Sequence, residues 1–326
     1  MGGAAEPGAR PMAKNLTIAA AGGLASAACY LATLIDAPAA LILAYLALLP
    51  LCAVGLGWGT GAGAIAAVVA AVVVAVIASV VVGFTFALAY GVPATLAVWL
   101  ALRSRAEPDG TVTWYPVGPL VSWLAVYACG SFALLALIGG DSGVREAIAE
   151  IEKIMTSVVP VDQNPQVAVL VRLISEFFPA IVISSWLVMM LVNLVLAQGL
   201  LERFKRNLRP RPQAATIVLP AWYTMVTVGA AAAALAARLL DLDTAGFIAR
   251  NVTLALLVPH FLVGLAVVHV WVRQWPARLA ILAGFYLLLL VFGWLSMVAV
   301  AALGFMEQWL FLRRRFARGN SQEDEQ

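Results

Sequence analysis

Residues 61–102 read GAGAIAAVVAAVVVAVIASVVVGFTFALAYGVPATLAVWLAL, 42 consecutive positions without a charged side chain. As a single α-helix this stretch would be about 63 Å long, roughly twice the hydrocarbon thickness of a bilayer. The stretch therefore predicts two membrane-spanning helices that fold back on each other. Gly83 is the expected corner between them, since glycine adopts turn conformations without steric cost.

The rest of the chain has the composition of a membrane protein. Of its 326 residues, 63% are hydrophobic and 11% are charged, and the mean hydropathy is +0.97. Soluble domains are about half apolar and a quarter charged, so a soluble globular fold is excluded. We expect an all-α polytopic transmembrane helical bundle of about 8–10 spans, because each span needs about 20 apolar residues.

Windows of about 19 residues place ten candidate spans along the chain. These are 15–35, 38–56, 61–81, 84–102, 118–138, 180–201, 217–239, 252–272, 279–292 and 294–312. One helix over the last two would be about 51 Å long, so we expect a break at Gly293. The span at 279–292 is short for a full crossing.

Basic residues predict the orientation. With ten spans, fifteen of the 20 lysines and arginines fall on one side, which should be the cytoplasm. The five on the other side are Arg145, Lys153, Arg172, Arg238 and Arg250. A single span at 279–312 would divide the basic residues eleven against nine, so the even number of spans is favoured. Both termini are therefore expected in the cytoplasm, and the protein is expected in the inner membrane of a bacterium.

This orientation divides the chain into three parts. A cytoplasmic N-terminal segment is expected at 1–14, a single transmembrane domain at 15–312, and a basic, then disordered, cytoplasmic tail at 313–326. The domain includes an extracytoplasmic amphipathic segment at 140–178.

Apolar residues in the amphipathic segment recur at helical spacing. Val144, Ile148 and Ile151 follow at steps of four and three, which places them on one face of a helix. Pro160 should end this helix, and a second should begin at Val167. The segment either lies on the outer leaflet or caps the bundle, or it forms a lid or partner-docking helix over an outward-opening cavity.

Alternating glycines connect the second and third spans. Gly57 and Gly59 lie in the middle of this row, which runs from Gly55 to Gly63. Without a preceding strand or a following Gly-Lys-Ser/Thr, the row is neither a dinucleotide fingerprint nor a P-loop. Such glycines either let backbone approach a ligand or form a turn with close helix contacts.

Polar residues inside the apolar spans are the other candidates for a ligand site, because they are costly in a bilayer. Thr253, His260 and Gly264 share one helix face at steps of seven and four, and His260 follows Pro259. Asn193 lies in the middle of the sixth span. The histidine is alternatively satisfied by a neighbouring helix, and the asparagine by an interhelical hydrogen bond.

Two further polar residues have simpler interpretations. His269 is nine residues from His260, on the opposite face, so the two histidines do not form a metal pair. Glu307 precedes the arginines at 313–315 by about two turns, which favours an ion pair over a proton relay.

Several function classes have no support. The net charge of +3, without basic stretches interleaved with aromatics, argues against nucleic acid as a partner. No catalytic triad, metal-binding or paired-carboxylate pattern occurs in the spans. The three cysteines lack metal or redox spacing. We therefore expect no enzyme activity, no cofactor and no metal.

Local patterns across the C-terminal half resemble the YybS-like predicted membrane proteins, a family of unknown function (DUF2232). The resembling stretches are NLVLAQ at 193–198, RP at 209–210, LPAW at 219–222, Asn251, PHFLVGLAVVH at 259–269, and GFMEQW at 304–309 followed by the arginines at 313–315. The family often has a second acid two residues after that tryptophan, whereas this chain has Phe311, so a paired-acid role is in doubt.

The resemblance implies no established activity. It implies a loose grouping with the substrate-binding S components of energy-coupling-factor (ECF) vitamin transporters and with the rod-shape protein MreD. The leading hypothesis is a small-molecule transport or substrate-binding component that is energised by a separate ATPase module. The alternative is a non-transporting scaffold for envelope or cell-shape proteins.

Overall fold

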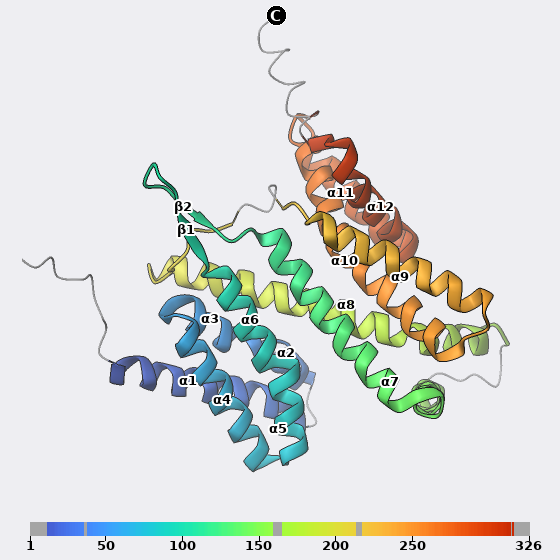
Figure 1. The fold of residues 1–326 in the computed structure, drawn as a ribbon, viewed down its shortest axis with the longest axis horizontal. Helices are drawn as coiled ribbons and strands as arrows, with labels where there is room; N and C mark the ends of the chain where they lie inside the picture. The colour runs from blue at the N-terminus through green and yellow to red at the C-terminus, as the bar shows by residue number, and fades with distance from the viewer. Residues whose placement is uncertain (1–11, 36–37, 159–164, 213–216, 314, 316–326) are drawn as a thin grey trace, which may run out of the picture. The chain divides into compact units, whose positions relative to one another are not determined.

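The computed structural model describes residues 12–35, 38–158, 165–212, 217–313 and 315, and nearly all of them are helical (Figure 1). In this part of the chain, eight helices are long and apolar enough to cross a membrane, and two shorter apolar helices follow. The all-α polytopic prediction is therefore confirmed. The outer parts of both predicted terminal segments, and Pro160, lie outside the described residues.

The described chain forms two compact units. Unit 1 comprises Met1–Pro116 and Val188–Pro212, and unit 2 comprises Val117–Leu187 and Gln213–Gln326. One long helix, α8 (Pro165–Arg203), contributes its first part to unit 2 and its second part to unit 1. The single domain expected at 15–312 stays a prediction.

Unit 1 is built from short helices. Its further elements are α1 (Met12–Leu31), η1 (Ala32–Leu34), α2 (Pro38–Tyr45), α3 (Leu48–Trp58), α4 (Thr60–Ile77), α5 (Val80–Phe86), a π-helical turn η2 (Ala87–Gly91), α6 (Val92–Ala101), β1 (Ser104–Ala106) and β2 (Val112–Trp114). The two strands form an antiparallel hairpin after α6 that the sequence analysis did not anticipate.

The expected corner at Gly83 is wrong. The chain reverses at Ala78 and Ser79, and the Ser79 hydroxyl accepts the Val82 N–H at 3.2 Å as an N-cap. Gly83 lies inside α5, where a Cβ would collide with Ala75 of α4. Its missing side chain therefore serves close packing of two helices, while a serine makes the turn.

The glycine row combines a corner with close helix contacts. Gly59 has φ +99° and separates α3 from α4. A Cβ on Gly63 would lie 2.9 Å from the Cα of Gly55, so α3 and α4 touch through their backbones. Gly59 itself has open space around its Cα.

Unit 2 surrounds one central helix. It contains α7 (Val117–Val158), the first part of α8, α9 (Ala221–Leu239), α10 (Asp243–Val272), α11 (Arg278–Phe292) and α12 (Trp294–Leu310). Helix α10 contacts α7, α9 and α12, and Figure 1 shows it alongside α9 and α12. The break predicted at Gly293 is confirmed, since this residue separates α11 from α12 at φ +51°.

The amphipathic segment forms the far ends of α7 and α8. Helix α7 has non-helical angles at Gly140 and ends at Val158, while α8 continues through Pro179. Ser175 of α8 approaches the Met155 sulfur at 4.0 Å, so the two ends pack together. The location of this segment outside the cytoplasm stays a prediction.

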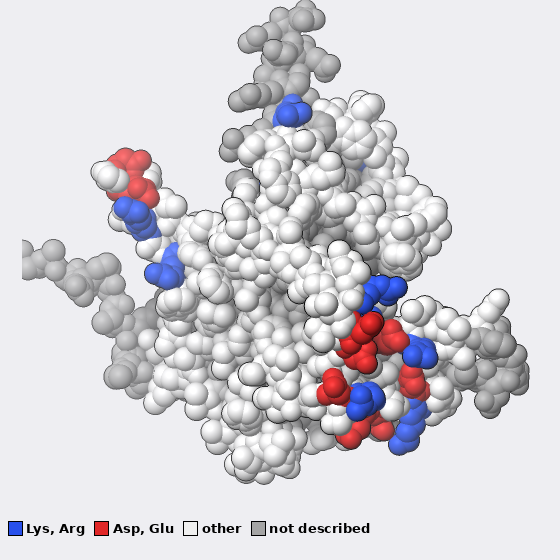
Figure 2. Space-filling view, turned by 45° about the vertical axis from the view of Figure 1, so that its right-hand side comes forward, with Lys and Arg blue, Asp and Glu red and all other residues white. Residues whose placement is uncertain are grey.

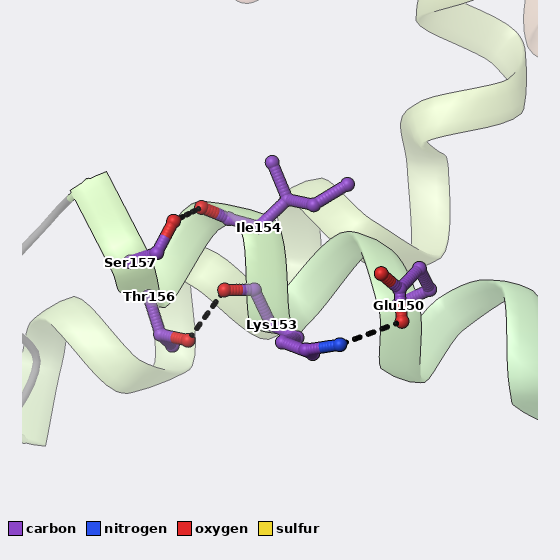
Figure 3. A network of polar contacts seen from close by, with 5 residues as sticks. All are labelled: Glu150, Lys153, Ile154, Thr156 and Ser157. Atoms are coloured by element: carbon purple, nitrogen blue, oxygen red, sulfur yellow. Dashed lines mark hydrogen bonds and ion pairs between the residues drawn. The ribbon is translucent and has the colours of Figure 1, made fainter.

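Charged side chains mark this part of the surface. On the face shown in Figure 2, acidic and basic residues gather mainly in one patch and near the tip of the β1–β2 hairpin, and the rest of the described surface on this face is almost entirely uncharged. In the last turns of α7, Lys153 pairs with Glu150 at 3.4 Å, and the Thr156 and Ser157 hydroxyls donate to carbonyls three residues earlier (Figure 3).

Candidate functional site

His260 lies in the interior of unit 2. Its side chain is fully buried in α10, with ring centroids 5.5 Å from Tyr223 of α9 and 5.2 Å from Phe305 of α12. An ionisable side chain inside a membrane bundle is a candidate for function by default. Three helices therefore build one polar position in an apolar core.

The hydrogen bonds of the histidine assign its tautomer. The Thr227 hydroxyl donates its single proton to the Tyr223 carbonyl at 3.0 Å, and lies 3.3 Å from His260 Nε2. Because that proton is used, we assign the ring proton to Nε2, which donates to Thr227. The Tyr223 hydroxyl in turn donates to the Leu256 carbonyl at 2.9 Å.

This assignment leaves His260 Nδ1 as an acceptor, and this atom has no hydrogen-bond partner among the described residues. One turn beyond Phe305 on α12, the Gln308 Oε1 accepts the Thr224 hydroxyl proton at 2.6 Å, while Gln308 Nε2 is also buried without a partner. The cluster of Tyr223, Thr224, Thr227, His260 and Gln308, here called the His260 cluster, thus offers an unused acceptor and an unused donor.

Two glycines bring the helices of this cluster together. A Cβ on Gly264 would collide with the Val300 carbonyl oxygen, and one on Gly304 with the His260 carbonyl oxygen. Small residues at helix crossings allow such backbone approach in membranes. Gly264, predicted as a ligand residue, therefore lies in the contact between α10 and α12.

The remaining predicted site residues occupy other positions. Thr253 is half-buried in α10, and its hydroxyl donates to the Ala249 carbonyl of its own helix at 2.7 Å. Gly57 of unit 1 is buried, and a Cβ there would lie 2.7 Å from the Leu201 side chain. The structure thus brings His260 and Gly264 together in unit 2, while Gly57, Gly59 and Asn193 belong to unit 1.

Asn193 closes a break between two helices. Its Nδ2 donates at 2.8 Å to the carbonyls of Tyr45, at the end of α2, and of Met189. Ser26 donates to the nearby Ala47 carbonyl at 2.6 Å. Carbonyls freed by the break are thus satisfied by side chains, as the absence of water in a bilayer requires. The Asn193 Oδ1 remains buried without a partner among the described residues.

Asn251 has a comparable role that sequence reasoning missed. Its Oδ1 accepts the Ala180 N–H at 2.9 Å, and its Nδ2 donates to the Glu176 carbonyl at 3.0 Å. These two backbone groups belong to the helical turn that contains Pro179, which has no N–H of its own to donate. The sequence signals for this contact were Pro179 near the start of one predicted span and the asparagine amide of Asn251 next to another.

Arg209 and Gln198 organise the loop after α8. The Arg209 guanidinium donates to the Ala101 carbonyl at the end of α6 at 3.0 Å, and Gln198 donates to the Arg209 carbonyl at 2.8 Å. Burial lowers the pKa of the Arg209 guanidinium. The arginine–proline pair of the resemblance is therefore part of a folded loop.

Glu307 forms the expected ion pair. Its carboxylate accepts Arg313 Nε at 2.8 Å and the Leu312 N–H at 2.7 Å. It thereby satisfies backbone donors just after α12, where Phe311 has a left-handed conformation. The ion-pair interpretation is confirmed.

Two surface grooves lie elsewhere. One, of about 660 Å³, is lined by α4, η2 and α6 in unit 1. The other, of about 490 Å³, lies between the ends of α7 and α8 in unit 2. Neither is lined by His260 or Asn193. Among the described residues, no three His, Cys, Asp or Glu side chains are grouped to hold a metal ion.

The chain has many apolar helices, and a few buried polar side chains bond backbone groups at the helix breaks. These features define a multi-pass α-helical membrane protein. The chain belongs to the family described as predicted membrane protein (DUF2232), whose profile matches residues 24–307. No curated protein and no solved structure matches the chain. The grouping with S components and MreD has no support from these comparisons.

Proposed function

We propose that the protein is a non-enzymatic, small-molecule-binding component of a bacterial inner membrane, with its ligand held at the His260 cluster. The observation that carries this proposal is the fully buried His260, whose Nδ1 lacks a partner among the described residues. Leaving such an atom unsatisfied costs about 1–3 kcal/mol. A ligand hydroxyl or amine donating to Nδ1 removes this cost.

The chemistry of the cluster suggests the class of ligand. His260 Nδ1 can accept a hydrogen bond and Gln308 Nε2 can donate one, and the rings of Tyr223 and Phe305 lie beside the imidazole. A small, uncharged molecule with a flat apolar part and a polar group suits such a lining.

Transport is the fuller form of this proposal. The sequence contains no nucleotide-binding motif, so active uptake needs a separate ATPase module as partner. An S-component-like role, which the family resemblance implies, has this organisation.

Retention of small molecules by the purified full chain tests the binding proposal. His260→Gln keeps a donor for Thr227 but removes the acceptor at Nδ1. Thr253→Val, which alters a hydroxyl bonded only within its own helix, is the matched control. We expect mass spectrometry to find a compound that the wild type and Thr253→Val retain and His260→Gln loses. Equal small-molecule profiles for all three would contradict the proposal.

The groove between α7 and α8 favours a second function, a scaffold for envelope proteins. Its wall combines the apolar Ile148 and Val171 with Arg145 and Glu152, a mixture typical of protein interfaces. Co-purification separates the two functions: an ATPase-bearing module supports transport, whereas cell-wall or division proteins that are lost on Arg145→Glu support the scaffold.

A further inference from the structure

The groove of unit 1 has an almost purely apolar lining. It runs between α4 on one side and η2 and α6 on the other, and its walls include Thr60, Val68, Val72, Leu96 and Trp99. These helices belong to two of the segments that are long and apolar enough to cross a membrane. An apolar groove on such helices suits lipid chains better than water.

The length of the groove matches one lipid leaflet. Along α4 it extends from Thr60 to Val72, a rise of about 18 Å. Half of a hydrocarbon core of about 30 Å is about 15 Å. A single acyl chain therefore fits along the groove from one end to the other.

A cation stands at one end of the groove. The Arg103 guanidinium carbon lies 4.7 Å from the centroid of the Trp99 ring, which itself lines the groove. Arg103 is exposed and takes part in none of the ion pairs found among the described residues. An interaction with a ring face does not need an oxygen acceptor for the guanidinium N–H groups, so these groups can still donate to a phosphate.

The surroundings of Arg103 agree with a headgroup position. Thr60, at the same end, begins α4, and the hairpin after α6 carries Arg105. Tryptophan favours the depth of the lipid headgroups. This is also the side that the basic residues predict to be cytoplasmic, where anionic lipids attract arginine and lysine.

We propose that unit 1 binds one anionic phospholipid, with an acyl chain in the groove between α4 and α6 and the phosphate on Arg103. The apolar groove selects a lipid and the stacked arginine selects an anionic one. The proposal is independent of the His260 cluster, which belongs to the other unit.

Lipid retention by the full chain tests this site. The protein is placed in nanodiscs that contain equal amounts of phosphatidylglycerol and phosphatidylcholine with matched acyl chains, and native mass spectrometry counts the lipids that stay bound. We expect about a fivefold preference for phosphatidylglycerol, the effect of one arginine near a membrane surface. Equal retention of the two lipids would overturn the proposal.

Two pairs of variants locate the lipid. Arg103→Gln should abolish the preference, whereas Arg105→Gln, two residues away on the exposed hairpin, should keep it. Ala64→Phe, which fills the groove, should lower retention of both lipids, whereas Ile65→Phe, outside the groove lining, should not. Equal effects of the two arginine variants would contradict a phosphate bound at Arg103. Equal effects of the two phenylalanine variants, or displacement of the lipid by excess inorganic phosphate, would contradict an acyl chain in the groove.

Discussion

Single polar residues inside this protein mostly satisfy backbone groups. Asn193 donates to the Tyr45 carbonyl at the α2–α3 break, Asn251 bonds two backbone groups of the turn of α8 that contains Pro179, and Glu307 binds amides after α12. In a bilayer no water is present to do this. A polar residue in a span is therefore first a partner for a helix break. His260 differs from these residues because it is ionisable and fully buried, and its Nδ1 has no partner among the described residues.

Asn251→Leu should destabilise unit 2. The substitution leaves the Ala180 N–H and the Glu176 carbonyl without a partner, which costs about 1–3 kcal/mol for each unsatisfied group. Thr253→Val on the same helix should cost less than 1 kcal/mol, roughly the value of one intrahelical hydroxyl bond. Equilibrium unfolding in mixed detergent micelles measures both. Similar losses for the two variants would mean that Asn251 is not a bridge.

Pro179 should be coupled to Asn251. Pro179→Ala restores an N–H that can bond the Ser175 carbonyl and removes the proline ring from this turn, so the Ala180 N–H and the Glu176 carbonyl can pair with each other when Asn251 is replaced. In that background Asn251→Leu should cost clearly less than it does alone, by about 0.5–3 kcal/mol as expected for residues in one network. A double-mutant cycle on the same unfolding assay gives this coupling, and additive effects would contradict it.

Residue identity alone did not reveal these partnerships. The amide of Asn193 was expected to bind either another helix or a ligand, and it binds the Tyr45 carbonyl. The sequence does explain the helix break beside Tyr45. Proline is tolerated in the first turn of a helix, so Pro50 favours the start of α3 at Leu48. The pairing itself depends on tertiary contact, which a hydropathy pattern does not contain.

At the scale of elements, glycines decide how helices cross. Gly264 and Gly304 bring the backbones of α10 and α12 together, while Gly284 of α11 has open space around its Cα. All three lie in helices, where glycine costs up to about 1 kcal/mol relative to alanine. For Gly264 and Gly304, the close contact between the two helices offsets this cost.

Gly264→Ala and Gly304→Ala should therefore weaken the α10–α12 pairing. Each added methyl group meets a carbonyl oxygen, so the backbone must shift, and we expect losses of about 1–3 kcal/mol. Gly284→Ala should leave stability unchanged or raise it slightly. Detergent-induced unfolding compares the three variants, and a loss for Gly284→Ala as large as for Gly264→Ala would refute the crossing argument.

The tip of the β1–β2 hairpin should respond to acid. Hydrogen bonds from the Thr111 hydroxyl, at 2.6 Å, and from its backbone N–H lower the pKa of the Asp109 carboxyl. A lowered pKa stabilises the turn above the unfolded value of about 3.9, and this stabilisation is lost as pH falls through the folded value. Thr111→Val should raise the Asp109 pKa toward its ordinary value in an NMR titration. An unchanged titration would contradict the hydrogen-bond assignment.

Most elements were predictable because a bilayer demands long apolar runs. The Gly293 break was found by length alone, since 34 residues exceed one crossing. The corner near residue 83 was misplaced because both a glycine and a serine were near, and the serine cap at Ser79 proved decisive. Helix α10 also begins nine residues before its predicted start, because polar residues outside the apolar window continue the helix.

At the scale of the whole molecule, lengths limit the topology. The first 23 residues of α7, before the irregular Gly140, extend about 34 Å and suffice for one crossing. Helices α11 and α12 extend about 22 and 26 Å, less than a full core. Because Gly293 makes a turn between them, the chain should return to the side from which α11 started, whether or not the pair crosses completely.

Cysteine labelling in intact cells tests this topology. Of the native cysteines, Cys52 and Cys129 are buried and Cys29 is half-buried, so the labelling is done in a Cys29→Ser background. Glu150→Cys, on the exposed outer end of α7, should react with a membrane-impermeant maleimide from outside. Glu107→Cys in the hairpin and Arg278→Cys before α11 should react only after permeabilisation, because the basic residues place both in the cytoplasm. Labelling of Glu150→Cys and Glu107→Cys from the same side would contradict the single crossing of α7, and with it the leaflet assigned to the phospholipid at Arg103.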